Sequence, residues 1–293
     1  MAERVQITQE MIRLYDEYTH LTLDRRGFLE KLTRAAGSGA AAAAIVPLLE
    51  ASKARAAVIA EDDARVVTET VRWAGEGGEM SGYLVRPAGV TDKLPGVIVI
   101  HENRGLNGHI QDVARRMALE GFVALAPDFL APAGGTPADE DRAREMIGAL
   151  DPVVTVSNAV ATVGFLAGHE ATTGKVGAIG FCWGGAMVNQ LATADPDLGA
   201  GVAYYGRTPD AQAVPNIKAR MLLHYAGLDE RINAGIPDYE AALKAAGVTY
   251  EIHVYEGANH AFNNDTSAAR YDAAAAGLAW ERTSAFLKSA LAG

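Results

Sequence analysis

Cysteine is nearly absent from this chain of 293 residues, which contains only Cys182. A single thiol can form no disulfide within the chain and no Cys-x-x-Cys metal site, so the fold has to be stabilised by its core. Positive charge is also scarce, because 26 Lys and Arg stand against 36 Asp and Glu, giving a formal net charge of −10. Binding to phosphate backbones needs clustered basic side chains, and the sequence therefore predicts no nucleic acid partner.

Long apolar runs are missing as well. The apolar stretch at 37–46 is too short to span a bilayer as a permanent helix, so stable membrane insertion is not expected. With 49% hydrophobic and 21% charged residues, the composition is that of an ordinary globular protein that can bury a large core.

The segment 1–57 differs from the rest of the chain. "LDRRGFL" at 23–29 is followed by a run of small residues and then by the A-x-A pattern Ala54–Ala56. A basic pair, a weakly apolar stretch and a small-residue cleavage site resemble a twin-arginine export signal. This interpretation predicts cleavage near Ala57 and a periplasmic or secreted protein.

An alternative interpretation of the same segment is a structural arm. Met11, Leu14 and Tyr15 have helical spacing, which is typical of an amphipathic helix, and this helix is expected to pack on a partner subunit. A retained arm would leave the protein in the cytoplasm. The sequence indicates no oligomeric state.

From about residue 58 to residue 293, strand-like and helix-like patterns alternate. This alternation predicts one α/β domain with a mostly parallel central sheet, covered by helices on both faces, after an opening hairpin. The expected strands are 66–73, 82–85, 94–101, 122–128, 176–181, 201–205, 220–225 and 250–255, and the expected helices are 110–120, 137–150, 153–168, one from about 185, 237–246 and 267–291.

Cys182 follows the predicted strand 176–181, in the stretch "GFCWGG". The spacing Gly180-x-Cys182-x-Gly184 is that of a nucleophile elbow, in which small flanking residues allow a sharp turn from strand to helix. The helix N-terminus beneath such a turn favours a thiolate. A small buried hydrophobic residue is the alternative, since most free cysteines are of that kind.

A nucleophile of this type needs a base and an orienting acid, in the chain order nucleophile, acid, histidine. Asp229 follows the predicted strand 220–225, and His260 follows the strand 250–255. Carboxyl ends of parallel strands lie at one edge of a sheet, so both residues are expected beside Cys182. Separately, each is more often a turn residue or a solvated side chain.

Together these residues resemble a known family, the dienelactone hydrolases of the α/β-hydrolase superfamily. The resemblance covers nearly the whole chain after the N-terminal segment. It implies an α/β-hydrolase fold, hydrolysis of a small-molecule lactone or carboxylic ester, the triad Cys182, Asp229 and His260, and no metal or organic cofactor. The motifs that carry it are "IHENRGLN" at 100–107, "GFCWGG" at 180–185, "AYYG" at 203–206, "HYAGLDERI" at 224–232 and "EGANHAFNN" at 256–264.

The resemblance also implies a role for Glu102, which matches the family's acid that contacts the cysteine. The thiol would be protonated at rest, and Glu102 would take its proton when substrate enters. From the residues alone, Glu102 is alternatively a satisfied buried acid near a strand end. His101 and Glu102 do not begin an H-E-x-x-H metal motif, because position 105 is glycine.

Further site residues are implied by the same resemblance. The backbone N–H groups of Asn103 and Trp183 would stabilise the oxyanion. Relatives that act on dienelactone hold its carboxylate with two arginines, and Arg144 matches the first, whereas Asn264 stands at the second position. The remaining substrate-binding candidates are Tyr204 and Arg207.

Three functional hypotheses remain open at this point. The first is a cysteine-dependent hydrolase of the dienelactone hydrolase (carboxymethylenebutenolidase) type. The second is a broad carboxylesterase or polyester hydrolase without a preference for dienelactone. The third is a non-catalytic binding protein on the same scaffold, because a fold does not establish a function.

Overall fold

A single sheet of eight strands forms the centre of the protein in this computed structural model, which describes residues 7–20, 22–50 and 57–292. The pattern Ala54–Ala56 lies outside the described residues. The spatial order of the strands is β1-β2-β4-β3-β5-β6-β7-β8. Their bounds are β1 Val66–Gly75, β2 Gly78–Pro87, β3 Leu94–Ile100, β4 Val123–Asp128, β5 Thr172–Phe181, β6 Ala200–Tyr204, β7 Arg220–Ala226 and β8 Tyr250–Tyr255.

Strand directions agree with the sequence pattern. The hairpin β1–β2 is antiparallel and β2 pairs antiparallel with β4, whereas β4, β3, β5, β6, β7 and β8 run parallel. The register pairs Ile100 with Gly180, and Phe181 with Tyr204. The ends of β3, β5 and β6 therefore lie level, and the loops that follow them meet at one edge of the sheet.

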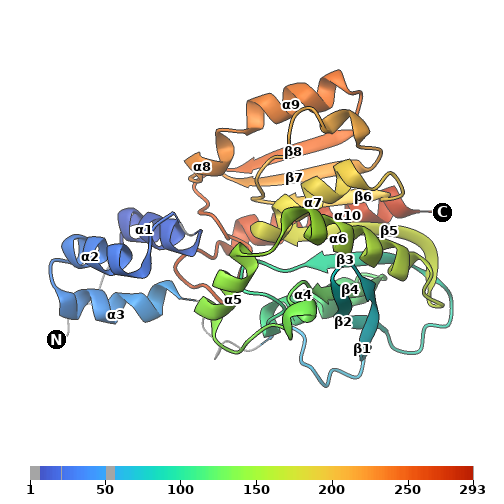
Figure 1. Cartoon of the computed structure of the whole chain (residues 1–293), viewed down its shortest axis with the longest axis horizontal. Helices are drawn as coiled ribbons and strands as arrows, with labels where there is room; N and C mark the ends of the chain where they lie inside the picture. The colour runs from blue at the N-terminus through green and yellow to red at the C-terminus, as the bar shows by residue number, and fades with distance from the viewer. Residues whose placement is uncertain (1–6, 21, 51–56, 293) are drawn as a thin grey trace.

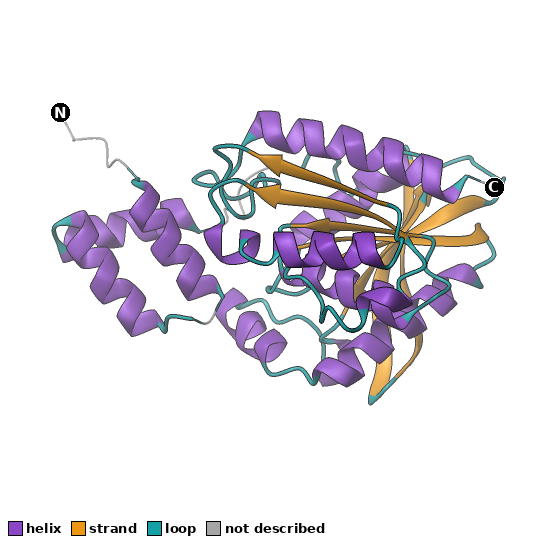
Figure 2. Ribbon diagram, turned by 90° about the horizontal axis from the view of Figure 1, so that it is seen from above, coloured by secondary structure: helices purple, strands orange, loops and turns teal. Residues whose placement is uncertain are grey.

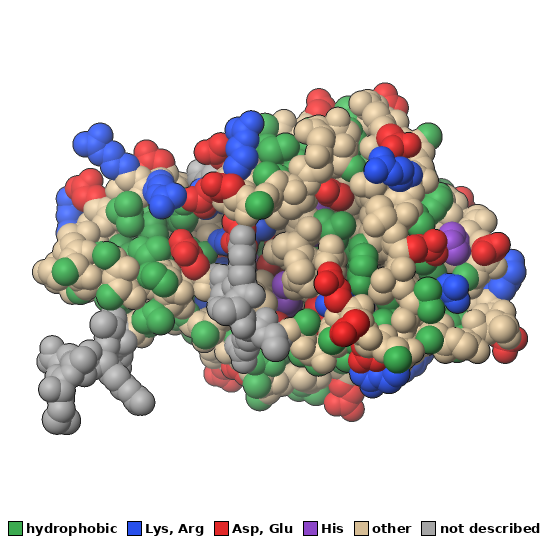
Figure 3. Space-filling view, turned by 90° about the horizontal axis from the view of Figure 1, so that it is seen from below, with side chains coloured by type: hydrophobic (Ala, Val, Ile, Leu, Met, Phe, Trp, Pro, Cys, Tyr) green, Lys and Arg blue, Asp and Glu red, His purple; other side chains and the backbone are tan. Residues whose placement is uncertain are grey.

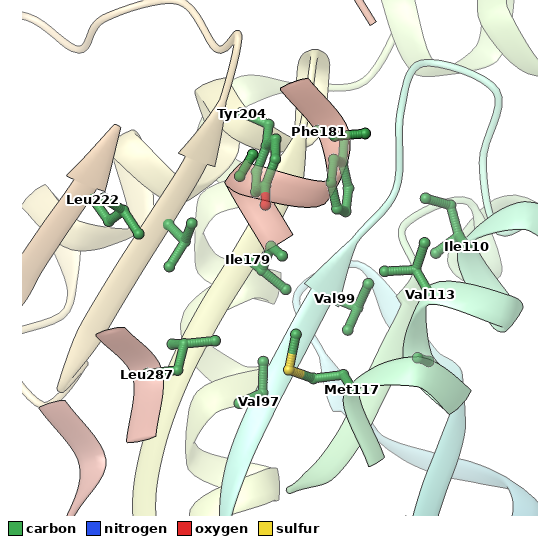
Figure 4. Close-up of a cluster of buried hydrophobic side chains, with 14 of the residues drawn as sticks. Val97, Val99, Ile110, Val113, Met117, Ile179, Phe181, Tyr204, Leu222 and Leu287 are labelled. Carbon is green, nitrogen blue, oxygen red and sulfur yellow. The ribbon is translucent and has the colours of Figure 1, made fainter. Parts of the chain in front are cut away.

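Helices cover both faces of this twisted sheet (Figures 1 and 2). On one face, α4 (Gly108–Leu119) and α10 (Ala273–Leu291) bury side chains such as Val113, Met117 and Leu287 against β3, β5 and β7 (Figure 4). On the other face lie α6 (Pro152–Ala167), α7 (Trp183–Ala194) and α9 (Ile236–Ala245). The predicted α/β architecture is confirmed.

Helix boundaries follow local capping chemistry. Asn107, Asp151 and Asp272 each accept a backbone N–H bond with their side chain at the start of a helix, which satisfies donors that the helix leaves unpaired. The last helix was expected from residue 267 and instead begins at Ala273, because residues 264–270 form turns closed by backbone bonds such as Ser267 N–H to Asn264 O. The shorter elements are α5 Glu140–Gly148, α8 Glu230–Asn233, η1 Ala131–Ala133 and η2 Val214–Asn216.

The described part of the segment 1–57 is mostly helical. It contains α1 (Gln9–Thr19), α2 (Arg25–Ala36) and α3 (Gly39–Leu49), drawn in blue in Figure 1 beside the sheet domain. These helices, here called the arm, share a small core that includes Tyr15, Phe28 and Leu32. In the described residues no single helix is long and apolar enough to cross a membrane, although the bent pairs α2–α3 and α5–α6 pass by length and composition only.

Charged side chains of both signs are interspersed over the arm and the sheet domain on the face shown in Figure 3. The described residues form no continuous basic surface on that face.

Candidate active site

The turn that carries Cys182 is strained in the way a nucleophile elbow requires. Cys182 lies between β5 and α7 with φ 55° and ψ −111°, a backbone conformation that side-chain-bearing residues rarely adopt. Its N–H donates to the Tyr204 carbonyl (3.0 Å), and its own carbonyl accepts from Ala186 N–H (3.0 Å), the first bond of α7. The thiol is thereby held above the carboxyl end of the sheet, at the N-terminus of a helix.

Small residues around the elbow are required by close backbone contacts. A Cβ on Gly180 would collide with the Gly184 carbonyl, and a Cβ on Gly184 would collide with the carbonyls of Ile100 and His101. A side chain at Gly180 would therefore force β5 and the start of α7 apart, and one at Gly184 would force β3 and α7 apart.

Replacing Gly184 with alanine is expected to destabilise the protein by about 2 kcal/mol or more, because the new methyl group would overlap backbone atoms that cannot move independently. Thermal unfolding measures the effect. Gly277→Ala on α10 is the matched control, since a Cβ there meets no atom within 4 Å and should be tolerated. Equal stability of the two variants would contradict the steric account of the elbow.

Asp229 and His260 form a buried pair at the same edge of the sheet. Asp229 follows β7 and caps α8, where its Oδ1 accepts from Ile232 N–H (3.2 Å). Its Oδ2 lies 2.5 Å from His260 Nδ1. Burial would raise the pKa of Asp229, but the hydrogen bond from His260 and its charge lower it overall, so this carboxyl stays ionised at neutral pH.

One ring nitrogen of His260 is unpaired in the described part of the chain, and the ring lies near Cys182. His260 is 5% exposed, and its Nε2 is buried without a hydrogen-bond partner among the described residues. A ring nitrogen of His260 and Cys182 Sγ lie within 4.8 Å of each other. The three residues that sequence reasoning placed at one sheet edge are therefore brought together.

The arm adds a histidine that sequence reasoning missed. His20, at the C-terminal end of α1, places its Nε2 3.2 Å from Cys182 Sγ, and its ring meets the His260 ring edge to face at 4.7 Å. Its Nδ1 lies 2.8 Å from the Asp16 carbonyl and 3.3 Å from the Asp16 carboxylate. The i, i+4 spacing of Asp16 and His20 on a predicted helix was the available signal.

Glu102 does not make the hydrogen bond that the resemblance implies. It lines the same small space as Cys182 and His260, but its Oε2 accepts from Asn264 Nδ2 at 2.7 Å. Among the described residues the hydrogen-bond partner of the sulfur is His20. No hydrogen bond joins Glu102 to Cys182 among the described residues, and the role of Glu102 as the acid that takes the thiol proton stays a prediction.

Both expected oxyanion donors lie where a substrate carbonyl could reach them. Trp183 is the first residue of α7, so its N–H has no partner within the helix. Asn103 follows β3 and lines the same cavity as Trp183 and Cys182. Neither backbone N–H donates a hydrogen bond within the described part of the chain. The Asn103 side chain is occupied separately, because its Nδ2 donates to the Thr19 carbonyl (2.5 Å).

A cavity of about 330 Å³ opens above Cys182. Arg144 and Arg207 both line it, as predicted, and Arg231 joins them. Arg144 is held by Asp141 (3.2 Å) and lies 4.0 Å from the centre of the Tyr18 ring of the arm. The other lining residues include Thr19, His20, Thr22, Ile147, Leu150, Met187, Gln190, Tyr205 and His260.

Two predicted substrate-binding residues lie elsewhere. Tyr204 is fully buried in the core, and its hydroxyl is 2.7 Å from Thr283 Oγ1, so the prediction for Tyr204 is wrong. Its neighbour Tyr205 lines the cavity instead, one residue past the end of β6. Asn264 is 3% exposed behind Glu102 and does not line the cavity, which corrects its assignment too.

Tyr205 lies at the wall of the cavity. Its hydroxyl is buried without a hydrogen-bond partner in the described residues. Burial raises the pKa of Tyr205 well above its ordinary value, with Glu102 and Cys182 adding to the effect, so the hydroxyl remains a donor. His101 has a structural position by contrast, with Nδ1 2.6 Å from the Glu102 carbonyl and Nε2 accepting from Phe129 N–H at 3.3 Å.

A strained nucleophile turn after a central parallel strand, with an acid and a histidine after later strands, defines this protein as an α/β-hydrolase. The family model of the dienelactone hydrolase family matches residues 80–291, so the chain belongs to the dienelactone hydrolase family. A second family model, described as YqhI-like, matches residues 2–37, a range that includes α1 and α2.

Individual relatives agree with this placement. A protein of Escherichia coli O157:H7 named "Putative carboxymethylenebutenolidase" is 32% identical over 247 residues, covering 79% of this chain and 90% of the relative. The crystal structure of a "Putative Dienelactone Hydrolase" from Klebsiella pneumoniae is 29% identical, with a TM-score of 0.68 over 75% of this chain and 97% of that one.

A third comparison supports the fold alone. The dienelactone hydrolase-like promiscuous phosphotriesterase P91 from metagenomic libraries is 24% identical, with a TM-score of 0.69 over 77% of this chain and 99% of that one. The predictions of the family and of a hydrolase are thus confirmed.

Proposed function

We propose that the protein hydrolyses small lactones and carboxylic esters through a thioester on Cys182, with Asp229 and His260 as the other members of the triad. The observation that carries this proposal is the strained elbow that presents Cys182 within 4.8 Å of a histidine held by a buried carboxylate. A buried cysteine with no chemical role would not need a backbone conformation of this kind.

The proposed reaction begins when the thiolate attacks the carbonyl carbon. A carbon–sulfur bond forms, and the carbonyl electron pair moves to the oxygen, where the N–H groups of Asn103 and Trp183 stabilise the charge. Collapse of this intermediate breaks the ester carbon–oxygen bond, and the leaving alkoxide takes up the proton that the thiol gave to a histidine when the thiolate formed. Water then attacks the thioester while His260 Nε2 removes its proton, and Cys182 leaves as a thiolate.

The lining of the cavity favours a small substrate that carries a carboxylate. Its volume of about 330 Å³ lies at the lower end of the range for small-molecule sites. Three arginines line it, and of these Arg144 is paired with Asp141 and Arg231 with Asp16 at 3.6 Å. Arg207 has no ion pair among the described residues and is the arginine most available to an anionic group.

A broad carboxylesterase is the second candidate, and the position of Asn264 favours it. A residue turned to Glu102 and away from the cavity cannot hold a substrate carboxylate. Hydrolysis of dienelactone and of a panel of neutral small esters by the full chain tests both candidates. A higher kcat/KM for dienelactone supports the first, and similar values across the panel support the second. Turnover of none would favour the non-catalytic alternative.

Replacing Arg207 with glutamine is expected to raise KM for dienelactone about fivefold, with little change in kcat, because an exposed charge pair contributes about 1 kcal/mol to binding. Neutral esters should be hydrolysed as before. Arg86→Gln, on β2 away from the cavity, is the control. Equal KM values for the parent and Arg207→Gln would show that Arg207 does not bind the substrate carboxylate.

We also propose that the arm remains attached to the mature protein, because the end of α1 and the residues after it contribute Thr19, His20 and Thr22 to the wall of the cavity. Twin-arginine export with cleavage before Ala57 is the alternative, and it would give a periplasmic or secreted protein. The intact mass of the protein isolated from its native cells distinguishes the two. A chain that begins near Ala57 would support export and contradict retention of the arm.

A further inference from the structure

The arm is attached to the catalytic edge by contacts along one side of α1. Tyr18 Oη donates to Asp141 at 2.8 Å, and its ring covers the guanidinium of Arg144. At the start of the helix, Gln9 Nε2 donates to Asn259 in the loop that carries His260 (2.5 Å). These contacts join the arm to α5 and to the loop after β8. They fix the end of α1 directly over the elbow.

The attachment of the arm places His20 next to Cys182. This histidine is the first residue after α1, and its ring lies between Asp16 on one side and the Cys182 sulfur on the other. Nδ1 at 2.8 Å from the Asp16 carbonyl carries a hydrogen, because a carbonyl can only accept. Nε2, at 3.2 Å from Sγ, therefore either accepts the thiol proton or, once it holds that proton, donates to the thiolate.

We propose that His20 is a second catalytic histidine: supplied by the arm and oriented by Asp16, it takes the proton of Cys182 and holds the nucleophile as a thiolate before substrate enters. This inference rests on the proposed role of Cys182 as the nucleophile. It gives the site two histidine–aspartate pairs, His20 with Asp16 and His260 with Asp229, on a single sulfur.

The electrostatics of the pair support this assignment. Burial alone would lower the pKa of His20, but the sulfur of Cys182 and the carboxylate of Asp16 raise it to about 9. Burial would likewise raise the pKa of Asp16, yet His260 and His20 hold it well below its ordinary value. The charged and titratable groups around His20 are Asp16, Cys182, Glu102, Arg104, Arg231, His260 and Arg270.

With two histidines at the site, each can carry out a different proton transfer. His20 is hydrogen-bonded to the Cys182 sulfur, whereas His260 Nε2 has no hydrogen-bond partner among the described residues and can act on other atoms. His20 would activate the thiol and protonate the leaving alkoxide with the same proton. His260 would remove a proton from the water that hydrolyses the thioester. That proton passes to His20 and restores the ion pair with the Cys182 thiolate, while the product acid releases its own proton to solvent.

A different role for the same contact is that the arm blocks the nucleophile. Autoinhibition of this kind predicts that weakening the contact raises activity. The proposal predicts the opposite, because removal of His20 takes away the base that accepts the thiol proton.

The experiment uses the fact that Cys182 is the only thiol of the chain, so alkylation reports on this residue alone. The rate of alkylation by iodoacetamide is measured against pH for the full-length parent and for His20→Ala, His20→Gln and Asp16→Asn. The control is His169→Ala, in the loop before β5 at the other edge of the sheet. Circular dichroism verifies the fold of each variant, and kcat/KM for one small ester is measured in parallel.

In the parent, alkylation should already be fast at about pH 6.5, below the ordinary range of a cysteine thiol. His20→Ala and His20→Gln should slow alkylation at that pH by about tenfold or more and move the midpoint up by about one pH unit. Asp16→Asn should have a smaller effect in the same direction, and His169→Ala none. The loss of kcat/KM in the His20 variants should be largest at acid pH and should shrink towards pH 9.

An unchanged midpoint in a folded His20→Ala or His20→Gln variant would overturn the proposal, and so would a rise in ester hydrolysis. The thiol measurement needs no turnover, so its outcome is separate from that of the proposed function. If the parent hydrolyses no ester but its alkylation midpoint still differs from that of the His20 variants, the proposed role of His20 stands and the proposed hydrolase reaction is wrong.

Discussion

Replacing Cys182 with alanine is expected to lower kcat/KM for every hydrolysed ester or lactone by about 10⁴-fold or more, because the only atom able to form the thioester is removed. The fold should remain intact, since alanine fits the site, and removal of the sulfur leaves the glycine contacts of the elbow unchanged. Steady-state hydrolysis of a small ester and thermal unfolding give both quantities.

Cys182→Ser is the matched variant for this experiment. The hydroxyl has nearly the same size and position but holds its proton far more tightly than a thiol does, so the variant should keep only a small part of the activity. Full activity in Cys182→Ala would show that the cysteine is not the nucleophile. It would also return the non-catalytic alternative to first place.

Replacing Asp229 with asparagine is expected to lower kcat/KM by about 10³-fold to 10⁴-fold, through the orientation and tautomer of His260. The carboxylate at 2.5 Å accepts the hydrogen on Nδ1 and so leaves Nε2 free to act as a base. An asparagine amide that donates to Nδ1 favours the other tautomer, in which Nε2 carries the hydrogen. The pH dependence of kcat/KM for the parent and the variant measures the loss.

The same variant tests the electrostatic role of Asp229 in folding. The pKa of Asp229 is lowered in the folded protein, so its contribution to stability is complete above about pH 4 to 5 and is lost as the pH falls through the folded value. At pH 7 the Asp229→Asn variant should unfold at a lower temperature than the parent, and the gap should narrow towards pH 3. Asp197→Asn, in a turn before β6, is the control.

Much of the fold and the positions of Cys182, Asp229 and His260 could be predicted because their signals are local. A buried strand such as "LPGVIVI" is apolar throughout, and glycines at fixed offsets indicate the elbow without any knowledge of the tertiary structure. The parallel register then brings loops after different strands to one edge, which places Asp229 and His260 beside Cys182.

The predictions for individual site residues failed where a long-range contact, or a shift of one residue along the chain, decides which side chain reaches the cavity. Tyr204 and Tyr205 are neighbours, but only the residue past the strand end faces the cavity. Asn264 stands where relatives that act on dienelactone have their second arginine, but its side chain donates a hydrogen bond to Glu102. The contact between His20 and Cys182 spans 162 positions and depends on how the arm docks, which no periodicity indicates.

The central claim, that Cys182 forms a thioester with the substrate, is tested most directly by intact-mass measurement of the full chain quenched in acid during turnover of a small activated ester. The account predicts a mass increase equal to one acyl group, located by peptide mapping on Cys182 and released by hydroxylamine. Prior alkylation of the thiol should abolish both the adduct and turnover. Continued hydrolysis after alkylation, or an acyl group on another residue, would contradict the account.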